Sequence, residues 1–98
     1  MNLYALNDPK PNTEIFQTLH QHGRLKIEAI RSHLTQPGEV YDQNEDEWVI
    51  LLRGNAGLKI KDTMVHLQAG ECVFLPKHTP HQVLSTSDDA LWLAVFSS

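Results

Sequence analysis

Short runs of alternating hydrophobic and polar residues cover most of the chain after residue 24. In the first run, Leu25, Ile27 and Ala29 share one face of an extended segment, as the two-residue period of a β-strand requires. Seven further runs, rich in β-branched or aromatic residues, lie at residues 40–42, 46–53, 56–61, 64–67, 71–75, 81–85 and 91–96. About eight short strands at this spacing predict an antiparallel sandwich or closed barrel.

Turn-forming residues separate these runs. Gly54–Asn55 and Asp62–Thr63 predict tight hairpins, and Pro76 and Pro80 bracket a loop that cannot be a central strand. We find no internal repeat, low-complexity linker or glycine-rich phosphate loop between the runs. The pattern therefore predicts one continuous β domain.

The segment before residue 24 has a different pattern. Ile15, Phe16 and Leu19 recur at helical spacing, capping residues precede them, and Gly23 follows as a stop signal. This predicts a short N-terminal helix at Thr13–His22 that covers an outer face of the barrel.

Length and charge limit the function. With 98 residues the chain is long enough for one domain, residues 1–98, which we divide into an arm and helix at 1–23 and a barrel at 24–96. Eight basic against twelve acidic residues give a net charge of −4. Because no basic surface is available to collect phosphates, we expect no nucleic-acid partner.

The compartment also follows from composition. A single cysteine excludes an internal disulfide, and the first eleven residues lack the basic start and apolar stretch of a signal peptide. The longest apolar run, residues 91–96, is six residues, whereas a spanning helix needs roughly 20. We therefore expect a cytoplasmic protein with no membrane partner.

Two motifs resemble those of the cupin family. The stretch from Gly38 to Gly54 resembles the first cupin motif, which has a glycine, two metal-binding histidines, a glutamate and, after six intervening residues, a turn glycine. Glu47 and Gly54 fit that spacing. In the second motif a glycine is followed after five residues by proline, and a histidine comes five positions after the proline. Gly70, Pro76 and His81 match it.

The resemblance implies a single cupin-type antiparallel β-barrel, a double-stranded β-helix or jelly roll, similar to the small single-domain, RmlC-like cupins of bacteria. That group does not supply a reaction. The first motif departs from the family because neither possible alignment of its two histidine positions contains a histidine. Tyr41 and Gln43 occupy the two positions, or Val40 and Asp42 if the loop is one residue longer.

The motifs nevertheless indicate a ligand pocket at the barrel mouth. Its expected residues are Tyr41, Gln43, Glu47 and His81, with Asp42 and His78 as additional candidates. Glu47 shares a strand face with Val49 and Leu51, so its carboxylate is costly there unless it is paired, hydrogen-bonded or protonated. Trp48 faces the opposite way, and we expect it to pack under the predicted helix or in a dimer contact.

Three functions remain open from the sequence. The first is a pocket that binds a small molecule and holds a divalent zinc, nickel, manganese or iron ion weakly through Gln43, Glu47 and His81. The second is a metal-dependent enzyme, isomerase or dioxygenase-like. The third is a structural or interaction homodimer without chemistry. An acidic cluster at residues 39–47 favours neutral or cationic ligands over phosphorylated ones.

Overall fold

The computed structural model describes all 98 residues and consists almost entirely of antiparallel strands. The elements are η1 (Leu3–Ala5), β1 (Thr13–His22), β2 (Leu25–His33), β3 (Val40–Tyr41), β4 (Asp46–Arg53), β5 (Asn55–Ile60), β6 (Thr63–Gln68), β7 (Cys72–Leu75), β8 (His81–Thr86) and β9 (Ala90–Ser97). One sheet has the order β1-β2-β9-β4-β7 and the other β3-β8-β5-β6. The predicted all-β jelly-roll class is confirmed.

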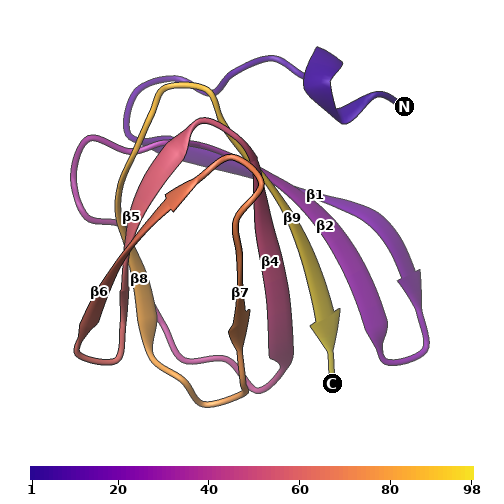
Figure 1. Cartoon of the computed structure of the whole chain (residues 1–98). Helices are drawn as coiled ribbons and strands as arrows, with labels where there is room; N and C mark the ends of the chain where they lie inside the picture. Colours follow the sequence, from indigo (N-terminus) through magenta and orange to yellow (C-terminus); the bar gives the residue numbers. More distant parts are fainter.

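The two sheets face one another and enclose the core (Figure 1). Alternation along β4 turns Val49 and Leu51 inward, and the β4–β9 register places them opposite Ala94 and Trp92. All four are buried and belong to a core cluster of 11 residues. The burial of this apolar surface is the main force that holds the sheets together.

The segment Thr13–His22 is strand β1, so the helix predicted there is wrong. It pairs antiparallel with β2 through a turn in which Gly23 takes φ +58°. The segment contains β-branched and aromatic residues that fit a strand, and β2 offers it a free edge of backbone donors and acceptors. The N-terminal helical element is instead the single turn η1, which lies apart from the sheets in Figure 1.

Gly54 does not form the predicted hairpin. It connects β4 and β5, which belong to different sheets, and its φ of +86° turns the chain from one sheet to the other. The second predicted hairpin exists between β5 and β6, where Lys61 and Asp62 form the turn and Ile60 pairs with Thr63. Local turn residues thus located the turns but not the sheets they connect.

The outer face of the larger sheet is only partly covered. Trp48 is 39% exposed and lies opposite Phe74, which is 58% exposed. The helix that was expected to cover Trp48 is absent, because residues 13–22 form β1. The N-terminal arm lies elsewhere: the Arg31 guanidinium donates to the Asn7 carbonyl at 2.8 Å. None of the helical segments has the length and hydropathy needed to cross a membrane.

Candidate functional site

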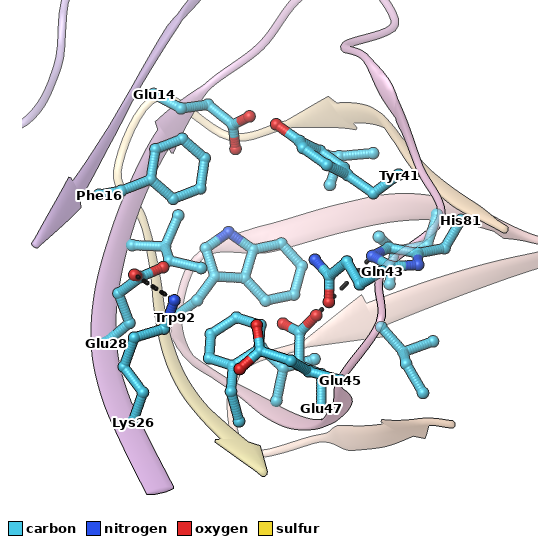
Figure 2. Close-up of a pocket in the computed structure, with 16 residues that line it drawn as sticks. Glu14, Phe16, Lys26, Glu28, Tyr41, Gln43, Glu45, Glu47, His81 and Trp92 are labelled. Carbon is cyan, nitrogen blue, oxygen red and sulfur yellow. Dashed lines mark ion pairs between the residues drawn. The ribbon is translucent and has the colours of Figure 1, made fainter. Parts of the chain in front are cut away.

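A pocket of about 370 Å³ opens between the inner faces of the two sheets. Its aliphatic lining comprises Ile30, Val49, Leu58, Leu75 and Val83. Its aromatic lining comprises Phe16, Tyr41, Trp92 and Phe96, and its charged or polar lining Glu14, Lys26, Glu28, Gln43, Glu45, Glu47 and His81. Figure 2 shows these polar groups projecting into one space from several strands. A concave, mostly apolar site with a few polar groups is typical of small-molecule binding.

Glu47 is a buried carboxyl group, 5% exposed, on the inner face of β4. Burial is the main cause that raises the pKa of Glu47 from 4.5 to about 7, and the neighbouring carboxylates of Glu28 and Glu45 contribute to this rise. Gln43 and Lys26 favour the charged form and partly oppose this shift of the pKa. Near neutral pH this carboxyl group can therefore either hold or release a proton.

His81 begins β8 and faces Glu47 from the other sheet. Its Nδ1 lies 2.9 Å from the carbonyl oxygen of Thr79, which can only accept, so Nδ1 carries the proton. In the neutral ring, Nε2 is then an acceptor, and it lies 3.7 Å from Glu47 Oε1. The two buried side chains form an acid–base pair that lines the pocket.

Tyr41 and Gln43 both point into the pocket, which decides the register of the first motif. The Tyr41 ring lies 5.8 Å from the His81 ring, centroid to centroid. Gln43 Oε1 is buried and has no hydrogen-bond partner in the chain. Such an acceptor costs about 1–3 kcal/mol when it stays unpaired, so Gln43 Oε1 is available to a donor in the pocket.

Asp42 and His78 lie outside the pocket. Asp42 Oδ1 is 3.3 Å from His78 Nδ1, and both side chains are largely exposed. His78 has φ +60°, a left-handed conformation that glycine adopts without strain. That conformation agrees with the glycine that the cupin motif usually has at this position.

Backbone contacts hold the two motifs together at the pocket. The His78 amide donates to the Gln43 carbonyl at 2.7 Å, and the Lys77 amide donates to Asp46 Oδ1 at 2.9 Å. These bonds fasten the loop before β8 to the loop before β4. They bring His81 and Glu47 together although 34 positions separate them in the sequence.

The pocket wall formed by β1, β2 and β9 contains residues that the sequence did not indicate. Trp92 Nε1 donates to Ser32 Oγ at 3.1 Å, and the Ser32 hydroxyl donates to Glu14 Oε2 at 2.6 Å. Burial is the largest cause that raises the pKa of Glu14. Glu14 and Phe16 were missed because their segment was assigned to a helix. Strand alternation in residues 13–22 was the signal that could have placed them on one inward face.

The donor set does not fit a tight transition-metal site. Glu47 and His81 converge, but a phenol and an amide occupy the positions where cupin motifs carry histidines. No group of three or more His, Cys, Asp or Glu side chains is arranged to hold a metal ion. Zinc, nickel and iron favour several nitrogen or sulfur donors, which these residues do not offer.

The two facing sheets and a pocket lined from both motifs define a cupin domain. Residues 32–96 match the family model of the cupin domain, so the chain belongs to this family. The resemblance to small single-domain cupins is thereby confirmed. Comparison with functionally curated proteins found no match.

Solved structures of similar proteins agree. A proposed mannose-6-phosphate isomerase from Ralstonia eutropha JMP134 is 32% identical, with a TM-score of 0.85 over 100% of this chain and 96% of its own. TT1209 from Thermus thermophilus is 22% identical, with a TM-score of 0.83 over 99% of this chain and 94% of its own. KdgF from Halomonas sp. is 17% identical, with a TM-score of 0.80 over 93% of this chain and 83% of its own. The likeness to TT1209 and KdgF, which are both less than 25% identical to this chain, shows a shared fold alone.

Proposed function

We propose that this cupin binds a small neutral or cationic organic molecule in the pocket between its sheets. The observation that carries the proposal is the buried polar centre formed by Gln43, Glu47 and His81. Gln43 Oε1 has no donor, and Glu47 and His81 Nε2 stand 3.7 Å apart among apolar side chains. A ligand that carries a hydroxyl or amine group would supply the missing hydrogen bonds.

Each residue of the polar centre can orient a bound ligand through a hydrogen bond. Gln43 Oε1 accepts from a ligand donor, and His81 Nε2 accepts a second hydrogen bond. Glu47 accepts when ionised and donates when protonated, because its pKa is about 7. The apolar wall around Val49 and Leu58 excludes water and strengthens these interactions.

A phosphorylated sugar is a poor fit, although a similar protein is a proposed mannose-6-phosphate isomerase. Phosphate is normally recognised by arginine, lysine or a helix N-terminus. Lys26 is the only lysine or arginine in the pocket lining, and its ammonium already lies 3.7 Å from Glu28. The surrounding carboxylates would repel a phosphate.

The proposal is tested by closing the pocket. Val83→Phe places a bulky ring on a half-buried lining position of β8, while Met64→Phe adds a similar ring at an exposed position of β6 outside the pocket. Binding of 3,3-dimethylbutan-1-ol, a compact apolar alcohol, is measured by NMR titration. We expect the wild type and Met64→Phe to bind the alcohol and Val83→Phe to lose binding. Equal binding by all three proteins would place the ligand elsewhere.

A further inference from the structure

Acidic side chains outnumber basic ones in the lining of the pocket. Four carboxyl groups line it, those of Glu14, Glu28, Glu45 and Glu47, against a single lysine. That lysine, Lys26, is engaged twice: its Nζ lies 3.7 Å from Glu28 and 4.7 Å from the centroid of the Phe96 ring. The remaining carboxylates therefore have no basic partner within ion-pair distance, apart from the contact of Glu47 with His81.

Aromatic rings line the end of the pocket where Glu14 lies. Figure 2 shows Phe16, Tyr41 and Trp92 around the same space, with the Glu14 carboxylate and the Tyr41 hydroxyl directed toward each other across it. The faces of aromatic rings attract cations, and the attraction is stronger at sites shielded from water. Trp92 is 3% exposed, and its orientation is set by the hydrogen bond from Nε1 to Ser32.

Glu14 is held as an acceptor at this end. One carboxylate oxygen, Oε2, accepts from the Ser32 hydroxyl at 2.6 Å, which fixes the side chain. The other oxygen, Oε1, has no hydrogen bond to the chain. A half-buried carboxylate with an open oxygen, next to three aromatic rings, offers both charge and surface to an organic cation.

We infer that the ligand of this pocket is an organic cation, an amine or quaternary ammonium compound, whose charged group lies between Glu14 and the rings of Phe16, Tyr41 and Trp92. The inference rests on the proposed binding function and names the chemical class of its ligand. The polar centre at Gln43, Glu47 and His81 then receives a hydroxyl or a second donor of the same molecule. A buried acceptor without a partner, Gln43 Oε1, independently indicates such a donor.

Three probes of nearly identical shape separate charge from shape: choline, the neutral 3,3-dimethylbutan-1-ol and the anionic 3,3-dimethylbutanoate. Their dissociation constants are measured with the full chain by calorimetry and by the NMR shift of the Trp92 indole proton. We expect choline to bind about tenfold more tightly than the alcohol, as a partly desolvated cation–π and ion-pair site would give. The carboxylate should bind most weakly.

Matched variants locate the cation. Glu14→Gln keeps an acceptor for Ser32 but removes the charge, and it should reduce the preference for choline over the alcohol at least about threefold. Phe16→Leu should also reduce the preference and leave the alcohol bound. Asp62→Asn removes the same charge in the exposed turn between β5 and β6 and should leave the preference unchanged.

The outcomes distinguish the two proposals. If the alcohol binds as tightly as choline and Val83→Phe abolishes binding, the pocket function stands and the cation inference is wrong. A preference for choline that is equally reduced by Asp62→Asn would also overturn it, because the effect would then come from net charge alone. If none of the three probes binds, both proposals fail.

Discussion

Glu47 Oε1 on β4 lies 3.7 Å from His81 Nε2 on β8, although the two strands belong to different sheets. The Thr79 carbonyl accepts from Nδ1 of His81, so in the neutral ring Nε2 is the acceptor that faces the Glu47 carboxyl group. Because the pKa of Glu47 is about 7, this carboxyl group changes its protonation near neutral pH.

Glu47→Gln should stabilise the protein above pH 7. The pKa of Glu47 is raised from 4.5 to about 7 on folding, so the unfolded chain loses this proton first as pH rises. Wild-type stability therefore falls between these pH values, and the loss approaches about 3 kcal/mol above pH 7. Glutamine imitates the protonated form and removes this pH dependence.

Urea unfolding at a series of pH values measures the effect, with Asp62→Asn as the control for removal of one exposed carboxylate. The two proteins, wild type and Glu47→Gln, should be similar in stability below pH 4.5. A variant less stable than the wild type at about pH 8 would contradict the prediction, since it would show that the ionised carboxylate is stabilised by a partner.

Introducing histidines at the two motif positions that lack them should create a metal site. Tyr41 and Gln43 line the pocket beside Glu47 and His81, so the double variant Tyr41→His/Gln43→His would assemble three imidazoles and one carboxylate. We expect its affinity for nickel and zinc to exceed that of the wild type by on the order of 100-fold, because two nitrogen donors are added. The wild type should bind these ions weakly.

The matched control is Val40→His/Asp42→His, which follows the other register of the motif. Val40 is 63% exposed and Asp42 lies outside the pocket, so these histidines should not join Glu47 and His81. Calorimetry with nickel and zinc compares the three proteins. Equal gains for the two double variants would mean that the pocket register is not the one described.

Trp92→Ala should destabilise the fold far more than Trp48→Ala. Trp92 is 3% exposed in the core, and its loss should cost about 3–5 kcal/mol. Trp48 is 39% exposed on the outer face, and its loss should cost about 1 kcal/mol. Urea denaturation measures both. Similar losses would indicate that the Trp48 face is covered in solution, as in a dimer.

Gly54→Ala should be more harmful than Gly70→Ala. Both glycines have a positive φ, +86° and +93°, which costs an alanine roughly 1–2 kcal/mol. At Gly54 the added methyl group would also collide with Ser87 Oγ and lie 3.1 Å from the Ala90 Cα, whereas nothing lies within 4 Å at Gly70. Thermal and urea unfolding should show the difference, and equal losses would mean that the turn relaxes without cost.

Strand positions after residue 24 could be read from the sequence because alternation and turn residues are local signals. The helix predicted at Thr13–His22 was wrong because strand alternation in this segment competes with a helical spacing, and pairing with β2 stabilises the strand. The short run at residues 13–22 fits both the helical and the strand period. The free edge of β2 decided between them, and with it the place of Glu14 and Phe16 in the pocket.

The amino-acid sequence by itself determined the β class, the two motifs and the presence of Glu47 and His81 without the usual histidines. Tertiary structure alone decided that Tyr41 and Gln43 face inward and that Asp42 faces solvent. It also decided which carboxylates and rings share one cavity. The physical reason is that strand periodicity is local, whereas the register of a loop and the pairing of sheets depend on contacts between distant residues.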